Sequence, residues 1–185
     1  FAPQPPPIVV LAHQLAVAAD EANVDANWSP SWKGYGSVDG KFYGAPMSAN
    51  VKSFVWYSPK EFKAKGYTIP TTYADMLTLS DKIVASGHKP WCAGVASGAA
   101  TGWTATEDIM LRTAGPDVYD QWVNHKIPFN DPQVVKALDM VGGILKNNKY
   151  VNGGFGDYKS ITTTTFQNGG LPILKGTCSL HRQAS

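Results

Sequence analysis

Short apolar runs alternate with segments of helical periodicity between residues 71 and 180, and this alternation restricts the chain to few folds. Thr71 or Thr72 can cap the first predicted helix, and Gly87 is its expected end. Its apolar residues recur at helical spacing: Met76, Leu77, Leu79, Ile83 and Val84. Residues 91–96 form a short apolar run typical of a buried strand. Strands that alternate with helices predict an α/β domain.

Two more helices are predicted beyond this strand. One covers residues 104–114 and ends at Gly115, and the other begins at Asp131-Pro132, where a capping side chain precedes a proline. The second helix has one apolar face, made of Val134, Val135, Leu138, Val141, Ile144 and Leu145. Residues 160–167 are predicted to be helical, and residues 171–180 are expected to contain the last strand.

The first third of the chain gives weaker signals. Residues 8–22 predict a helix of modest quality, whereas residues 27–40 are rich in Gly, Ser and Pro, which is typical of irregular chain. The sequence Val38-Asp39-Gly40-Lys41 predicts a tight turn. Residues 41–45 and 51–57 are expected to be strands, and a proline between them favours an edge or crossing position.

The composition excludes several classes of protein. The 185 residues are 43% hydrophobic and 16% charged, which is sufficient for a packed core. A net charge of +2, with scattered lysines, argues against binding to nucleic acid. The longest apolar candidate, residues 8–19, falls short of the roughly 20 residues needed to span a bilayer.

No arrangement of residues predicts a catalytic or metal centre. The four histidines lack the spacing of metal ligands, and the motifs of serine hydrolases, P-loops and dinucleotide sites are missing from the sequence. Glu107 and Asp108 are adjacent in a predicted helix, so their side chains diverge by about 100° around its axis. We interpret them as carboxylates at a helix start, and we predict no catalytic residue, no metal ion and no cofactor.

Two segments and two cysteines leave alternatives open. Residues 97–103 (SGAATGW) join a strand to a helix, so Trp103 either stacks on a ligand ring or packs back on the core. Arg182 and Gln183 either donate hydrogen bonds to a ligand or form an exposed strand end. Cys92 and Cys178 are either buried thiols or a disulfide that closes a loop of roughly 85 residues, worth about 4 kcal/mol.

Several sequence words resemble the extracellular solute-binding proteins of bacterial ABC sugar importers. The first are VDGKFYGAP at residues 38–46 and VWYSPK at residues 55–60. Others resemble the α-glucoside-binding branch of this family: KPWC at residues 89–92, EDIMLRTAGP at 107–116, WVNH at 122–125 and LHRQAS at 180–185.

The resemblance implies an α/β fold of the periplasmic-binding-protein type (type II), with a mixed sheet flanked by helices. Residues 1–42 would be a remnant of the first lobe, residues 43–57 the crossing or hinge strands, and residues 58–185 the second lobe. The chain would therefore be a truncated clamshell, part of a protein that holds its ligand between two lobes. Taken alone, it would bind sugar with millimolar affinity or not at all.

The resemblance also implies a non-catalytic function: binding of a sugar or oligosaccharide, in particular an α-glucoside, for delivery to the permease subunits of an ABC importer. The implied ligand-binding residues are Ser48, Asn50, Lys52, Trp103, Glu107, Arg182 and Gln183. It favours a Cys92–Cys178 disulfide on neighbouring strands and an extracytoplasmic location, in the periplasm or on the cell surface, with a lipid anchor on the full-length form. Association with the membrane would then be indirect.

Two other functions are compatible with the residues. A carbohydrate-active hydrolase would use Glu107 with a second carboxylate such as Asp131 or Asp157. A structural module would form a homodimer through an exposed lobe interface and bind no ligand.

Overall fold

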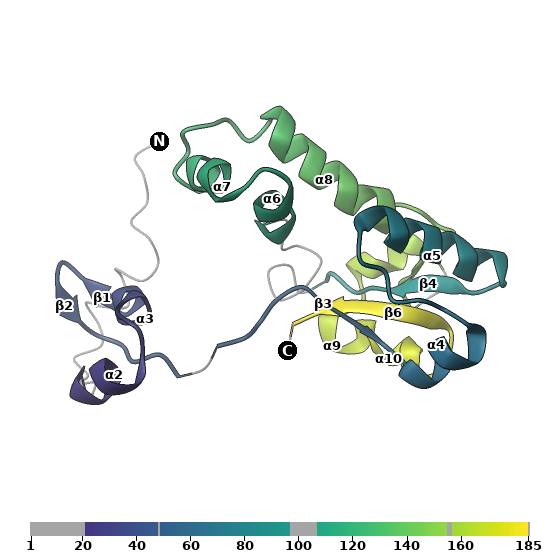
Figure 1. Ribbon diagram of the computed structural model, residues 1–185, viewed down its shortest axis with the longest axis horizontal. Coiled ribbons are helices and arrows are strands. Elements are labelled where there is room, and N and C mark those ends of the chain that lie inside the picture. Colours follow the sequence, from purple (N-terminus) through teal and green to yellow (C-terminus); the bar gives the residue numbers. More distant parts are fainter. Residues whose placement is uncertain (1–20, 48, 97–106, 155–156, 185) are drawn as a thin grey trace. The chain divides into compact units, whose positions relative to one another are not determined.

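The computed structural model describes residues 21–47, 49–96, 107–154 and 157–184. The chain divides into two compact units, Phe1–Asn50 and Val51–Ser185 (Figure 1). Most of the helix predicted over residues 8–22 lies outside the described residues. Within the described part of the chain, no helix has the length and apolar character needed to cross a membrane.

The described residues of the first unit form two short helices and a hairpin. Helix α2 covers Glu21–Asn27 and α3 covers Pro30–Tyr35, while β1 (Ser37–Val38) pairs with β2 (Lys41–Phe42). The prediction of irregular chain over residues 27–40 was therefore wrong. Pro30 fits the first turn of α3, and the rings of Trp28 and Trp32 pack edge to face at 5.6 Å, so the two helices support each other.

The tight turn predicted between Val38 and Lys41 is confirmed. Both central residues have left-handed backbone conformations, with φ of 50° at Asp39 and 73° at Gly40. This is the geometry of a two-residue hairpin turn, for which Asp-Gly is a preferred sequence. Strand β2 ends at Phe42, so the strand predicted over residues 41–45 is shorter than expected.

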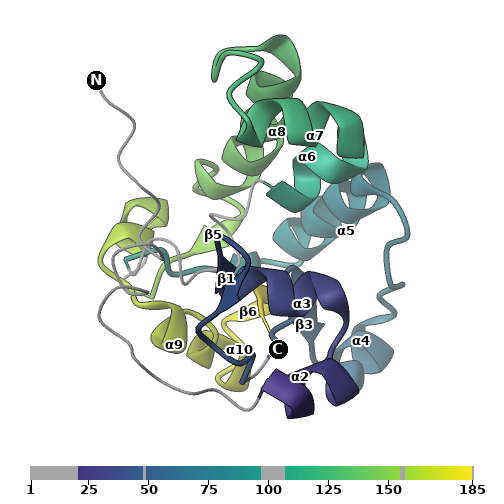
Figure 2. The same ribbon diagram turned by 90° about the vertical axis from the view of Figure 1, so that its left-hand side faces the viewer.

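The second unit is an α/β domain around a four-stranded mixed sheet in the order β3-β6-β4-β5 (Figures 1 and 2). The strands are β3 (Phe54–Tyr57), β4 (Lys89–Cys92), β5 (Val151–Asn152) and β6 (Cys178–Gln183). The helices are α4 (Pro59–Lys65), α5 (Tyr73–Ala85), α6 (Glu107–Thr113), α7 (Pro116–Val123), α8 (Pro132–Leu145), the 3₁₀ helix η2 (Tyr158–Thr162), α9 (Phe166–Gly169) and α10 (Leu171–Leu174). Strand β4 runs parallel to β5 and β6, whereas β3 is antiparallel to β6.

The two faces of this sheet are covered by different helices. Helix α5 packs on one face, where the Trp91 indole donates a hydrogen bond of 3.0 Å to the Ser80 hydroxyl. On the other face, His181 of β6 lies against Gly170, the residue before α10. The sheet is therefore the middle of three layers, as an α/β fold requires.

The start of α5 agrees with its prediction. The Thr72 hydroxyl accepts a hydrogen bond from the Asp75 amide at 3.0 Å, and the Asp75 carboxylate accepts one from the Thr72 amide at 3.2 Å. This reciprocal pair is a capping box. The predicted start of α8 is confirmed too, because the Asp131 carboxylate accepts a hydrogen bond from the Gln133 amide at 2.9 Å.

The buried face of α8 is narrower than predicted. Val134, Ala137 and Ile144 are buried, whereas Val135 and Leu138 are 41% and 39% exposed. The buried positions form one stripe that first contacts Met110 of α6 and then joins the sheet core. Residues 135 and 138 flank this stripe, so their apolar side chains remain at the surface.

Three other predicted elements differ from those in the structure. Strand β4 covers Lys89–Cys92, because the amides of Val95 and Ala96 donate to the carbonyls of Ile161 and Thr164 and leave the sheet. The helix predicted over residues 160–167 is divided between η2 and α9. The start of residues 171–180 forms α10, since Pro172 fits a helical first turn, and only its end belongs to β6.

Candidate functional site

One edge of the sheet in the second unit gathers several predicted site residues. Because β4, β5 and β6 are parallel, their carboxyl ends lie at the same edge, and antiparallel β3 begins there. Arg182 and Gln183 are the last residues of β6, and Lys52 precedes the start of β3, where Phe54 pairs with Gln183. Ligands of open α/β sheets bind at such carboxyl ends.

Four further residues were predicted to bind the ligand: Ser48, Asn50, Trp103 and Glu107. Ser48 and Trp103 lie outside the described residues. Glu107 begins α6, and Asn50 is an exposed residue of the first unit. The ligand roles of all seven residues stay predictions.

Arg182 and Gln183 project to opposite faces of the sheet, since successive strand residues alternate. The Gln183 side-chain oxygen accepts a hydrogen bond from the Ala184 amide at 2.9 Å, and its backbone carbonyl accepts one from the Trp56 indole at 3.3 Å. These contacts hold the end of β6 in place.

The Arg182 guanidinium forms an ion pair with Asp108 of α6 and donates a hydrogen bond of 2.9 Å to the Ser53 hydroxyl. Side-chain exposure is 8% for Arg182 and 25% for Asp108. Sequence reasoning assigned Arg182 to a ligand and did not identify Asp108 or Ser53 as its partners. One feature of the sequence could have indicated such a partner: Arg182 lies in a strand of mostly buried residues. A buried arginine requires a counter-charge within the protein.

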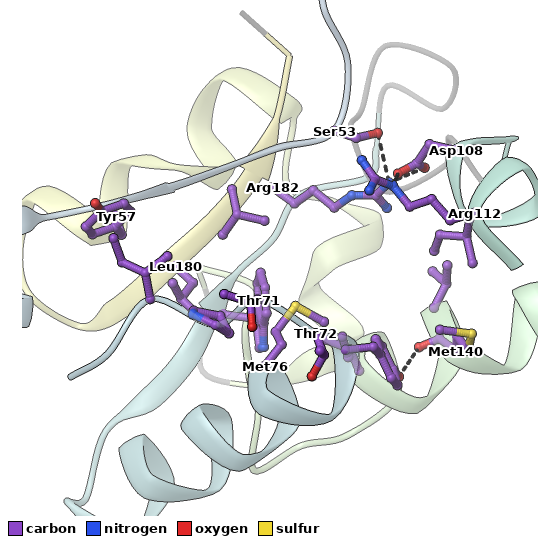
Figure 3. A pocket seen from close by; sticks show the side chains of 18 of the residues that line it. Ser53, Tyr57, Thr71, Thr72, Met76, Asp108, Arg112, Met140, Leu180 and Arg182 are labelled. Carbon is purple, nitrogen blue, oxygen red and sulfur yellow. Dashed lines mark hydrogen bonds and ion pairs between the residues drawn. The ribbon is translucent and has the colours of Figure 1, made fainter.

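A cavity of about 520 Å³ lies on the Arg182 face of the sheet, beneath α5, α6 and α8 (Figure 3). Its polar end holds Ser53, Asp108, Arg112 and Arg182, and Tyr57 and Leu180 lie at the other end. The other lining residues are mostly apolar: Val55, Phe62, Ile69, Pro70, Thr71, Thr72, Tyr73, Met76, Trp91, Ile109, Thr113, Met140, Val141 and Ile144. The volume is within the range of small-molecule sites.

Two polar groups in the cavity wall are partnered within the protein. The Tyr73 hydroxyl donates a hydrogen bond of 2.9 Å to the Met140 carbonyl and so joins α5 to α8. Burial raises the pKa of this phenol above its usual value, which keeps the donor protonated. The bond from the Trp91 indole to Ser80 likewise occupies the polar atom of another lining side chain, so the part of the wall away from the polar end is mainly apolar.

His181 lies on the opposite face from the cavity, and its surroundings favour the neutral imidazole. The ring nitrogen Nδ1 lies 3.0 Å from the Cys92 carbonyl, to which it donates. Burial lowers the pKa of His181 below its usual value of 6.5, although the hydrogen bond to the Cys92 carbonyl opposes this shift. The other histidines of the described chain, His88 and His125, are exposed.

We expect the stability of the second unit to fall as the pH decreases below about 6.5. Because the folded pKa of His181 is the lower one, the unfolded chain takes up the proton first, and the stabilisation present above pH 6.5 is lost. One proton limits the slope to about 1.4 kcal/mol per pH unit. Urea unfolding between pH 7.5 and 5 measures the effect, which His181→Gln should remove and the control His88→Gln should retain.

An equal pH dependence in the His181→Gln variant would contradict this assignment. Where that variant does not fold, the imidazole resonances of the unmodified chain give a second measurement. The His181 signal should titrate below pH 6.5, and a midpoint above that value would contradict burial of the neutral ring.

The predicted Cys92–Cys178 disulfide is present and links β4 to β6, with 5.6 Å between the two Cα atoms. Both cysteines are buried. The structure therefore decides between the two alternatives that the residues alone left open. Among the described residues, no group of three or more histidine, cysteine or carboxylate side chains is arranged to hold a metal ion.

Comparisons with known proteins are consistent with this architecture. A model of the bacterial extracellular solute-binding protein family matches residues 5–172. The osmoprotective compounds-binding protein GgtB of Synechocystis sp. is 45% identical over 85% of the chain, and the alpha-glucosides-binding periplasmic protein AglE of Rhizobium meliloti is 41% identical over 84%. The aligned residues are 38% and 35% of these two relatives, so the chain spans little more than a third of their length.

Among solved structures, the bacterial solute receptor AcbH, described as preferring β-D-galactopyranose, superimposes with a TM-score of 0.65 at 23% identity. The match covers 96% of the chain and 43% of AcbH. At this identity the likeness establishes the fold: a mixed α/β lobe of the periplasmic-binding-protein type.

Proposed function

Because the chain belongs to the bacterial extracellular solute-binding proteins, we propose that it binds a sugar or oligosaccharide, specifically an α-glucoside, for delivery to an ABC importer. The bound sugar leaves chemically unchanged. The permease subunits of the importer are the partner, and the protein acts outside the cytoplasm. The buried disulfide is consistent with an oxidising compartment.

The observation that carries this proposal is the identity of 45% and 41% to two binding proteins over about 85% of the chain. One relative is named for osmoprotective compounds and the other for α-glucosides, and the second name supports an α-glucoside as the ligand. The sheet edge where Lys52, Arg182 and Gln183 gather supports binding there, since it carries the carboxyl ends of three parallel strands.

The carboxylates support binding over hydrolysis. Asp108 is held by Arg182. Asp131 and Asp157, the partners that a hydrolase would need for Glu107, accept amide hydrogen bonds at the N-termini of α8 and η2. These carboxylates therefore have structural roles. In the proposed mechanism, Trp103 stacks on a sugar ring, while Lys52, Glu107 and Gln183 bind hydroxyl groups.

Titration of the chain with two glucose disaccharides tests the proposal. We expect maltose, which is α-linked, to bind with a dissociation constant of about 1 mM, and β-linked cellobiose to bind at least about fivefold more weakly. Saturation-transfer NMR and calorimetry measure both. Trp103→Ala should abolish maltose binding, whereas Phe129→Ala, which removes an aromatic ring that is 67% exposed, should leave it unchanged.

Equal binding of the two disaccharides would overturn the α-glucoside assignment. Release of glucose from maltose, lost in Glu107→Gln, would overturn the non-catalytic function. Failure of a wider panel of sugars to bind would contradict sugar binding by this chain altogether.

A further inference from the structure

The cavity beneath α5, α6 and α8 is poorly matched to a sugar. Its wall is formed mainly by side chains such as Met76, Trp91, Ile144 and Leu180, and the Tyr73 hydroxyl and the Trp91 indole N–H both donate hydrogen bonds within the protein. Hydroxyl groups transferred onto this wall would lose hydrogen bonds to water without replacement, which is unfavourable. An apolar ligand body incurs no such cost.

Apolar side chains also remain exposed where the cavity meets solvent. Ile69 is 57% exposed and Val55 is 40% exposed, although both line the cavity. The burial of this apolar surface by a ligand is favourable because it removes the surface from water. The lining therefore offers a hydrophobic driving force for binding.

The polar end of the cavity carries a positive charge. Three of the described lining residues are charged: Asp108, Arg112 and Arg182. Arg182 and Asp108 form the buried ion pair and neutralise each other. Arg112 is 78% exposed and lies 4.0 Å from Asp108, so one guanidinium charge is left in excess (Figure 3).

Charge and shape together define a ligand class. The polar end is set by residues 53 and 182, and the apolar part extends along β3 to Tyr57, four residues farther, which corresponds to about 13 Å of extended strand. We propose that this cavity binds an amphipathic organic carboxylate, with its aromatic or aliphatic body against the sheet and its carboxylate beside Arg112. This site goes beyond the proposed sugar binding and does not use Trp103.

Two probes with the same naphthyl group but different polar ends measure how much the carboxylate charge contributes to binding. 3-(2-Naphthyl)propanoate carries the carboxylate, and 3-(2-naphthyl)propan-1-ol replaces it with a neutral hydroxymethyl group. In calorimetric titrations of the complete 185-residue chain at low salt, we expect the carboxylate to bind about three- to fivefold more tightly than the alcohol, as one exposed ion pair allows. This preference should decrease at 0.5 M salt.

Two variants assign the binding to this cavity. Arg112→Gln should reduce the preference for the carboxylate to nearly one while leaving the alcohol unaffected. Ile69→Asn should weaken both probes several-fold, because it places an amide against the apolar body. The matched control Val123→Asn changes a residue that is 47% exposed and lies outside the cavity lining, and it should bind both probes normally.

Each other outcome contradicts the proposal. Absence of binding at 1 mM excludes the site, and a preference that persists in Arg112→Gln places the carboxylate elsewhere. Equal binding of both probes would mean an apolar cavity without anion recognition. The Trp103→Ala variant separates this proposal from sugar binding, because it should bind the carboxylate normally whether or not maltose binding exists.

Discussion

Removal of the Cys92–Cys178 disulfide is expected to lower the free energy of unfolding of the second unit by about 2–4 kcal/mol. The bond joins residues separated by 86 positions, so it restricts the unfolded chain strongly. This loss is a large fraction of the stability of an ordinary domain. Urea unfolding of the Cys92→Ala/Cys178→Ala variant, compared with the unmodified chain, measures it.

Reduction of the two chains provides the matched control. Reduction should destabilise the unmodified chain by a similar amount and leave the double variant unchanged, because that variant has no bond to break. A difference below about 1 kcal/mol between the two chains would show that the disulfide contributes little, and that packing of the two buried side chains is sufficient.

Replacement of Arg182 by methionine is expected to cost about 2–3 kcal/mol. It leaves the Asp108 carboxylate without its buried counter-charge, with the exposed Arg112 remaining at 4.0 Å, and the Ser53 hydroxyl without its donor. The value lies below the range for fully buried pairs, because a quarter of the Asp108 side chain remains in contact with water. Chemical unfolding at pH 7 and low salt measures the loss.

A double-mutant cycle separates this ion pair from simple packing. Arg182→Met combined with Asp108→Leu should destabilise less than the sum of the single changes, with a coupling energy of at least about 1 kcal/mol. Arg112→Gln is the control: its side chain is 78% exposed, so its effect should stay within about 0.5 kcal/mol. Additive single changes would contradict a stabilising pair.

The sequence predicted those elements whose causes are local. The capping box between Thr72 and Asp75 and the Asp-Gly turn of the first unit depend on residues a few positions apart. Residues 171–180 show the limit of this reasoning. Their apolar composition suited a strand, but Pro172 begins a helical turn and Gly176, with φ of 65°, redirects the chain before β6.

The candidate site was less predictable because its contacts join distant residues. Arg182 and Asp108 are 74 positions apart, and no local pattern indicates that they meet. The sequence did indicate Arg182 as a residue of interest, through its resemblance to a family, but not that its guanidinium binds a carboxylate within the protein. The cavity is also a property of packing, since its lining comes from four helices and three strands.

The order of the strands has a consequence for folding. Strand β6 is the last strand of this sheet along the chain, yet it lies between β3 and β4. Its partners in β3 precede it by more than a hundred residues, as in the pair of Phe54 with Gln183. During synthesis, β3 and β4 therefore cannot form their hydrogen bonds to β6 until β6 has been made. Such non-local pairing slows folding and prolongs the time during which chaperones can bind the incompletely folded chain.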